Sequence, residues 1–314
     1  MRWGRAYFGL QAAAGVAWWI AVALSPWVRV TTLGDLDAAA VAVFDIPLFV
    51  VASAIAAFGV RAAAVVATGW TVLVAVALAG YATVTTEAGW GVLVMAAAAG
   101  CSLIALLLVL LGRIPTEWII SGPFAFRPAA VRAKPTAHIA ATFAQVAVFW
   151  GSFLAVFPVA ISLLERRWAV GIQFPSVAVP VGITLLVLAS ALGLSSAISM
   201  STRGNGTPLP SAMLNRLVIA GPYRLIRNPM AVAGIVQGVA VGVLLSSWLV
   251  IVYAIIGCIL WNYAVRPLEE ADLEERFGDE FRRYRDSVRC WIPSFASLTG
   301  RGSAQAQPRG ASRT

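Results

Sequence analysis

The chain has 314 residues, of which 60% are hydrophobic and only 12% are charged, and its formal net charge is +9. Soluble domains keep about a quarter of their residues charged, so this composition excludes an ordinary soluble protein. Nearly all the cations are arginines, and beside so much apolar sequence they indicate topology signals and contacts with anionic lipid rather than with nucleic acid. We therefore predict an integral membrane protein that binds no nucleic acid.

Apolar runs long enough to cross a bilayer recur along the chain. They lie near residues 7–24, 41–59, 62–84, 89–111, 139–164, 177–200 and 230–265. The last run is long enough for two spans, with Ser246 and Ser247 at the turn between them. Because open sheet edges are not tolerated in lipid, the spans are expected to be helices. The predicted fold class is all-α, a polytopic transmembrane helix bundle of about eight spans.

The cations are distributed unequally between the segments that connect the spans. If the N-terminus is cytoplasmic, every lysine and arginine falls on the cytoplasmic side except Arg29, Arg166 and Arg167. Cytoplasmic loops carry the excess of basic residues in membrane proteins. We therefore expect both the N- and the C-terminus to be cytoplasmic, in a protein of the cell membrane.

Composition divides the chain into four regions. Residues 1–112 form a membrane region of four spans, and residues 113–138 form a cytoplasmic linker rich in proline and arginine. Residues 139–298 hold the remaining spans and all the clustered polar motifs. Residues 299–314 have the composition of a disordered tail.

Asp45 is the exceptional charge within the first four spans. A carboxylate inside a span is by default a candidate for function. Its place near one end of its run, just before Pro47, favours instead a side chain that reaches the membrane interface or caps a helix. The three cysteines and the single histidine, His138, show no metal-ligand spacing, so no metal site is predicted.

Residues 221–230 form a basic, proline-punctuated segment in an otherwise apolar chain. Asparagine is a favoured N-cap and proline a favoured first residue, so Asn228 and Pro229 predict the start of a helix. A helix N-terminus binds carboxylates or phosphates, and Arg224 and Arg227 stand beside this one. Taken alone, these residues fit an ordinary capped helix with arginines that contact lipid.

A second polar cluster, residues 266–270, follows the last apolar run. Pro267 is expected to end the preceding helix at Arg266 and to begin a new one, with Glu269 and Glu270 in its first turn. These glutamates suit a helix N-terminus without any ligand. Two spans between the clusters would bring them to the same membrane face. Together they would offer cations for a carboxylate and anions for an ammonium, as a bound amino acid moiety requires.

The sequence beyond this cluster predicts a helical lid. Gly278 and Asp279 are placed to end one helix and cap the next. Apolar residues recur every three or four positions, at Leu273, Phe277, Phe281, Tyr284, Val288 and Trp291. A peripheral membrane anchor has a similar pattern. We predict cytoplasmic C-terminal helices that cap a cofactor site.

An ordered set of motifs resembles a known family. The set comprises Gly-Thr-Pro-Leu-Pro at 206–210, Leu217 and Val218, residues 221–230, Glu269 and Glu270 with Leu273, Phe277, Gly278, Glu280, Phe281, Tyr284 and Val288, and Ile292 with Pro293. It is similar to the isoprenylcysteine carboxyl methyltransferase family, which is grouped with the phospholipid N-methyltransferases. The order of the motifs is specific, although each alone is weak. The resemblance covers residues 139–295 and leaves the first four spans unexplained.

The resemblance implies an integral membrane enzyme that uses S-adenosylmethionine to methylate a lipophilic acceptor from the bilayer, such as an isoprenylcysteine carboxylate or a phospholipid. Carried over by position, the catalytic residues are Arg266, Glu269 and Glu270. The family often has histidine where Asn228 stands and tyrosine where Ala231 stands; asparagine can cap a helix but cannot act as a general base. The implied cofactor-binding residues are Tyr223, Arg224, Arg227, Asn228, Pro229, Met230, Arg266 and Glu270.

Two other classes of protein stay open. An NADPH-dependent membrane reductase of the sterol-reductase type has a similar arrangement of C-terminal helices, but the pair Glu269 and Glu270 and the Asn-Pro-Met sequence argue against it. A non-enzymatic transport or assembly protein would explain the four additional spans. A transporter should carry polar residues at mid-membrane, and the spans show few. The sequence indicates no oligomeric state.

Overall fold

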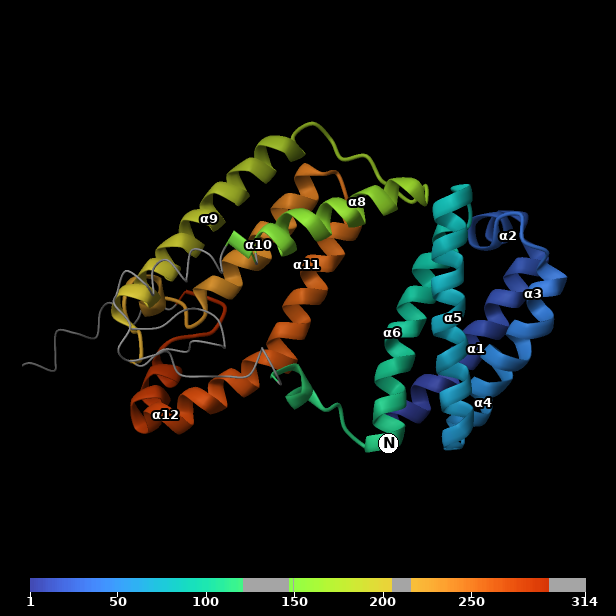
Figure 1. Cartoon of the computed structure of the whole chain (residues 1–314), viewed down its shortest axis with the longest axis horizontal. Coiled ribbons are helices and arrows are strands. Elements are labelled where there is room, and N and C mark those ends of the chain that lie inside the picture. The colour runs from blue at the N-terminus through green and yellow to red at the C-terminus, as the bar shows by residue number, and fades with distance from the viewer. Residues whose placement is uncertain (121–146, 149, 205–215, 294–314) are drawn as a thin grey trace, which may run out of the picture. The chain divides into compact units, whose positions relative to one another are not determined.

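The computed structural model describes residues 1–120, 147–148, 150–204 and 216–293, and these form helices and connecting loops with no strand (Figure 1). The all-α prediction is therefore confirmed for this part of the chain. The predictions for the loop at 206–210, for His138, for the tail from 299 and for most of the linker lie outside the described residues. The chain divides into two compact units: unit 1 is residues 1–115 and 161–172, and unit 2 is residues 116–160 and 173–314.

Six helices of the described residues are long and apolar enough to cross a membrane. The 16-residue apolar helix α10 (Pro229–Leu244) is shorter. Part of the predicted span at 139–164 is not described, so the count of about eight spans stays a prediction. The six helices are Arg2–Leu24, Ala38–Ala57, Arg61–Thr85, Gly89–Leu111, Ala178–Arg203 and Trp248–Ser287.

Unit 1 is built on four of these long helices. Glycine allows close approach of the backbones: a methyl group on Gly91 of α6 would lie 2.1 Å from the Thr32 carbonyl oxygen of α2. Small residues at such contacts are typical of packed membrane helices. The elements of this unit are α1 (Arg2–Leu24), α2 (Pro26–Leu33), α3 (Ala38–Asp45), the π-helical turn η1 (Ile46–Val51), α4 (Ala52–Ala57), α5 (Arg61–Thr85) and α6 (Gly89–Leu111).

A buried polar network joins the helices of unit 1. The Gln11 amide donates to the Ser53 hydroxyl at 3.1 Å and to the Thr71 hydroxyl at 3.4 Å, and accepts from the Ser102 hydroxyl at 2.7 Å. These residues belong to α1, α4, α5 and α6. Because buried polar groups are costly unless hydrogen-bonded, this network fixes how the helices pack.

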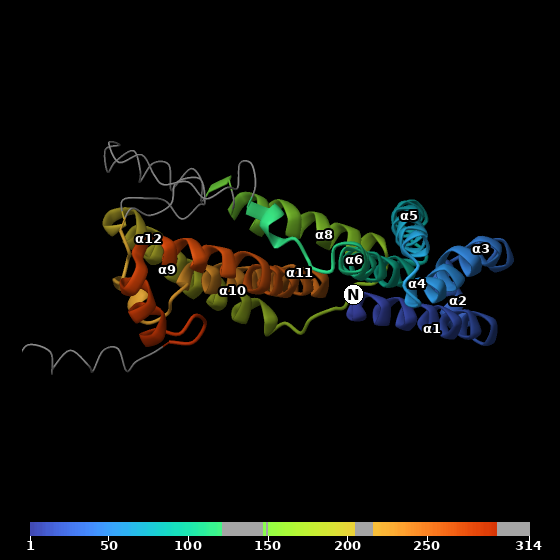
Figure 2. The ribbon, with the colours of Figure 1, turned by 90° about the horizontal axis from the view of Figure 1, so that it is seen from below.

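Two short helical turns, η2 (Thr116–Ile120) and η4 (Gly151–Val156), precede α8 (Phe157–Arg167). The end of α8 belongs to unit 1, where the Trp168 indole donates to the Thr83 hydroxyl at 2.9 Å. In unit 2, α10 packs between α9 (Ala178–Arg203) and α11 (Trp248–Leu260) (Figures 1 and 2). The Gln237 amide of α10 donates to the Ser190 hydroxyl of α9 at 2.9 Å.

Helices α10 and α11 form the predicted hairpin. The chain turns at Ser246, whose φ is +50°, and the Ser247 hydroxyl caps α11 by accepting from the Val250 amide at 3.2 Å. The predicted turn at Ser246 and Ser247 is confirmed. The arms pack closely, since a methyl group on Gly238 would lie 2.9 Å from the Ala254 Cβ atom.

The predicted helix break at Arg266 is wrong. Helix α11, the π-helical turn η7 (Trp261–Val265) and α12 (Arg266–Ser287) follow one another directly, and Arg266 is helical, with φ −54° and ψ −45°. Pro267 lacks the N–H that an α-helix requires, and the wider π turn before it accommodates that loss without ending the helix. The helix changes direction at this point (Figure 1).

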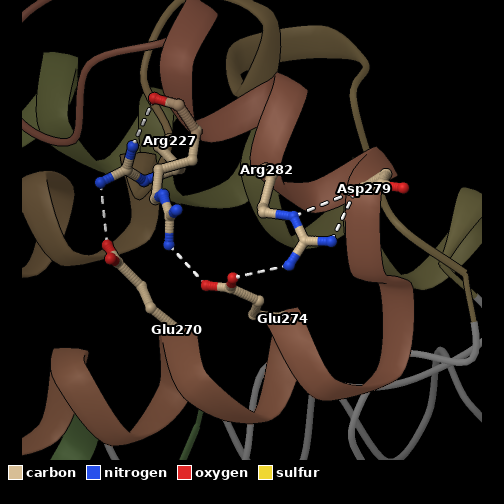
Figure 3. Close-up of polar contacts among 6 residues, drawn as sticks. Arg227, Glu270, Glu274, Asp279 and Arg282 are labelled. Atoms are coloured by element: carbon tan, nitrogen blue, oxygen red, sulfur yellow. Dashed lines mark hydrogen bonds and ion pairs between the residues drawn. The ribbon is translucent and has the colours of Figure 1, made fainter.

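Helix α12 reverses at Gly278, as its sequence predicts. Gly278 has φ 52° and ψ −126°, a conformation that side-chain-bearing residues avoid. The two halves are joined by Glu274, which accepts from Arg282 at 3.2 Å and from Arg285 at 2.6 Å (Figure 3). Five of the six residues of the predicted apolar stripe form one cluster with Leu217: Leu273, Phe277, Phe281, Tyr284 and Val288. The sixth, Trp291, lies beyond α12 and contacts Trp261 instead.

Candidate functional site

Three segments far apart in the sequence meet at the start of α10. They are residues 221–230, the first turn of α12, and residues 288–291 that follow α12. The Arg227 amide donates to the Arg289 carbonyl at 2.9 Å, and the Asn228 amide donates to the Cys290 carbonyl at 3.5 Å. The two polar clusters predicted to meet across the hairpin do meet.

The start of α10 is capped as predicted. The Asn228 side chain accepts from the Ala231 amide at 3.2 Å, and Pro229 occupies the first helical position, where its missing N–H is harmless. Pro229 is buried, and Met230 is partly buried beside it. Asn228 therefore fixes the entry of the chain into α10.

Arg227 joins both ends of α12. Its Nη2 atom donates to the Glu270 carboxylate at 2.9 Å (Figure 3). Its Nη1 atom donates to the Arg285 carbonyl at 2.9 Å and the Val288 carbonyl at 3.1 Å. The side chains of Arg227 and Glu270 are only 13% and 22% exposed, so water weakens this pair less than it weakens a surface pair. Arg227 and Glu270, both predicted site residues, are in direct contact.

Tyr223, another predicted site residue, is buried. It belongs to the short helical turn η6 (Gly221–Arg224), is 5% exposed, and accepts at its carbonyl from the Tyr284 hydroxyl at 2.7 Å. Burial raises the pKa of both tyrosine hydroxyls. Tyr223 packs with Val218 and Met200, and its bond with Tyr284 joins η6 to the second half of α12. Arg224, at the end of the same turn, is partly buried.

Among the described residues, Glu269 and Arg266 form no ion pair. The charged residues of α12 begin directly after the apolar segment 248–265, so α12 lies outside the membrane-spanning part of the helix. Burial, helped by the nearby charges of Glu270 and Asp272, raises the pKa of Glu269 to about 7. The Nε atom of Arg266 is buried without a hydrogen-bond partner, and its guanidinium lies beside the Cys290 thiol. A buried donor without a partner is costly, which suits a position where a ligand binds.

No residue pattern indicates how residues 288–291 are held. The Trp291 indole N–H donates to the Asn262 side-chain oxygen at 2.9 Å, and the Trp291 and Trp261 rings meet edge to face at 5.3 Å between centroids. Both partners lie in η7. The chain after α12 is therefore held against the π turn η7.

The comparisons with known proteins point to the same region. A family model described as phospholipid methyltransferase matches residues 177–280. The match runs from the start of α9 into α12 and includes every predicted site residue. It confirms the resemblance to membrane methyltransferases predicted for the C-terminal half of the chain. No curated protein matches the chain.

Proposed function

We propose that the protein is an integral membrane methyltransferase that uses S-adenosylmethionine and acts on a lipophilic acceptor. The observation that carries the proposal is the meeting of Arg227 with Glu270, beside Arg266 and Glu269, inside the segment that matches the phospholipid methyltransferase family. Cations and anions come together there at one end of an apolar hairpin.

The residues present fit the amino acid part of this cofactor. Its carboxylate needs a cation, which Arg266 or Arg227 would supply, and its ammonium needs an anion, which Glu269 or Glu270 would supply. The Nε atoms of Arg266 and Arg227 are both buried without a hydrogen-bond partner, and this supports the fit. When bound, the cofactor supplies a methyl group already activated on a positively charged sulfur.

The protein then has to align the reactants and exclude water. Helix α12, whose two halves fold on each other at Gly278, covers the site with its apolar cluster. Alignment and water exclusion account for a large part of the rate in such transfers. Asn228 caps α10 and cannot accept a proton from the acceptor. A carboxylate or thiolate acceptor therefore suits this site, and an amine would have to arrive uncharged.

The same proposal includes how the protein lies in the membrane. We propose that both termini are cytoplasmic, because this orientation puts all but three of the basic residues on the cytoplasmic side, as is typical of membrane proteins. The acceptor enters from the bilayer, and the arginines of α12 face anionic lipid headgroups. An isoprenylcysteine carboxylate and a phospholipid are the two acceptor classes that we propose to test.

Isothermal titration of the purified protein with S-adenosylmethionine tests the cofactor. We expect binding by the unchanged protein and at least about tenfold weaker binding by Glu269→Gln and by Arg266→Gln, since each loses a charge-assisted contact. Glu275→Gln, which changes an exposed carboxylate of the same helix, and Arg283→Gln, an exposed arginine, are matched controls. Absence of binding by the unchanged protein overturns the proposal.

A parallel titration with NADPH separates the methyltransferase from a reductase. Binding of NADPH in place of S-adenosylmethionine would favour the reductase. The acceptor is then sought by incubating protein, S-adenosylmethionine carrying a labelled methyl group, and either an isoprenylated cysteine or phosphatidylethanolamine. Label in one acceptor, lost in Glu269→Gln and kept in Glu275→Gln, identifies its class.

A further inference from the structure

Unit 1 contains a cavity of about 620 Å³ that the proposed function does not use. Its volume is within the range of about 300–1,000 Å³ found for small-molecule sites. The wall is contributed by all the long helices of the unit and is almost entirely apolar and aromatic. Trp18, Phe44 and Trp70 are among its lining residues.

Asp45 is part of the cavity wall. Its side chain is only 6% exposed and does not cap a helix, so the expectation of a cap is wrong. One carboxylate oxygen accepts from the Trp19 indole N–H and the other accepts from the Trp70 indole N–H, each at 2.9 Å. Three helices, α1, α3 and α5, thus hold Asp45 in one position.

The charge of Asp45 is not balanced by these contacts. An ionised carboxylate has about four acceptor positions, and the two indoles use one on each oxygen. Among the described residues, no cation forms an ion pair with Asp45. Buried charges are normally paired, because an unpaired charge in an apolar environment is very costly. Because both oxygens accept N–H bonds, the two indoles favour the ionised form of Asp45, and a cation bound in the cavity would balance its charge.

The backbone beside Asp45 is also unusual. The π-helical turn η1 begins at the next residue, Ile46, and includes Pro47. Such turns are rare and often occur at functional sites.

We infer that unit 1 binds a lipophilic ammonium compound in this cavity, with Asp45 as its counterion. The apolar wall suits a hydrocarbon body, and the aromatic side chains add attraction for an ammonium group, since ring faces favour cations. A carboxylate within a span typically serves as such a partner. The inference concerns unit 1 alone and does not depend on the proposed methyltransferase.

The test uses the full-length protein in nanodiscs of phosphatidylcholine, a lipid without net charge, and radiolabelled dodecylamine, which is cationic at pH 7.5. Binding to empty nanodiscs is subtracted. We expect saturable binding at one site per chain. Unlabelled dodecylamine should displace the label, whereas dodecanol, which has the same chain and no charge, should not displace it at the same concentration.

Asp45→Asn retains the size of the side chain and removes its charge, so we expect the affinity to fall at least about tenfold. Asp35→Asn, an exposed carboxylate of the same unit, should bind like the unchanged protein. Ala14→Phe fills part of the cavity while leaving Asp45 and its two indoles in place, and should also weaken binding. Absence of saturable binding, or equal affinity in a folded Asp45→Asn variant, overturns the inference. If Asp45→Asn does not fold, unchanged binding by Ala14→Phe overturns it.

Discussion

The Arg227 guanidinium and the Glu270 carboxylate lie 2.9 Å apart, although 43 residues and a complete apolar hairpin separate them in the sequence. The same guanidinium also holds the carbonyls of Arg285 and Val288. One side chain thus connects the start of α10, the start of α12 and the end of α12. Arg227 therefore supports both the contact between the two polar clusters and the fold of α12.

Replacing Arg227 by lysine should destabilise the lid even though the charge remains. A single ammonium cannot reproduce the several directed bonds of the guanidinium, so we expect a loss of about 1–3 kcal/mol in the free energy of unfolding. Denaturant unfolding in mixed micelles, followed by circular dichroism, measures this loss. Arg283→Lys, at an exposed position, should change the free energy by less than about 0.5 kcal/mol. Equal stability of the two variants would contradict the conclusion that Arg227 holds the two ends of α12 together.

Glu269 should make stability depend on pH. Its folded-state pKa of about 7 lies above its ordinary value of 4.5, so the folded protein keeps a proton that the unfolded chain has already released. The stabilisation is complete below pH 4.5 and is lost as the pH rises through about 7. We expect the thermal midpoint to fall by about 2–4 °C between pH 5.5 and pH 8. That fall should be absent in Glu269→Gln and present in Glu275→Gln; a fall that persists in Glu269→Gln must come from another group.

Gly278→Ala tests the reversal of α12. No atom lies within 4 Å of the added methyl group, so the cost comes from the backbone conformation alone and should be about 1–3 kcal/mol. The bonds from Arg282 and Arg285 to Glu274 should loosen with it, which limited proteolysis of the lid would detect. Gly257→Ala, at a helical position that also has space for a methyl group, is the control and should be neutral or slightly stabilising.

Gly91→Ala tests the packing of unit 1. The new methyl group would lie 2.1 Å from the Thr32 carbonyl oxygen, so α6 and α2 would have to separate. Overpacking of this kind costs about 1–3 kcal/mol, and we expect a lower thermal midpoint with loss of monodispersity in detergent. Gly100→Ala lies on the same helix and meets no atom within 4 Å. If both variants are equally stable, the close contact of α2 and α6 is not important for the fold.

Local patterns predicted much of unit 2. Residue spacing predicted the apolar stripe of α12, the turn at Ser246 and Ser247, the cap at Asn228 and the reversal at Gly278, because each depends on residues a few positions apart. The meeting of the two polar clusters followed from the hairpin that was predicted between them. The break at Arg266 was predicted wrongly. The prediction assumed that Pro267 would end the helix, but the π turn before it accommodates the missing hydrogen bond.

Long-range side-chain contacts were not predictable in the same way. Asp45 finds its indole donors 26 residues earlier in the chain and 25 residues later. Gln11 finds its partners on three other helices. No spacing in the sequence indicates which faces of helices will meet, because nearly every face in unit 1 is apolar. The polar contacts there become visible only once the helices are packed.

The turn between α10 and α11 lies at the opposite end of the hairpin from Arg227 and Glu270. One arm is the 16 residues of α10, and the other is the 13 residues of α11 with the 5 residues of η7. Each helical residue adds about 1.5 Å of length and about 100° of rotation. A single insertion or deletion in either arm would therefore move Glu270 along the helix and turn it away from Arg227, whereas most substitutions on the lipid-facing side would leave the two in register. The number of residues across the hairpin, more than their identity, keeps the two halves of the site together.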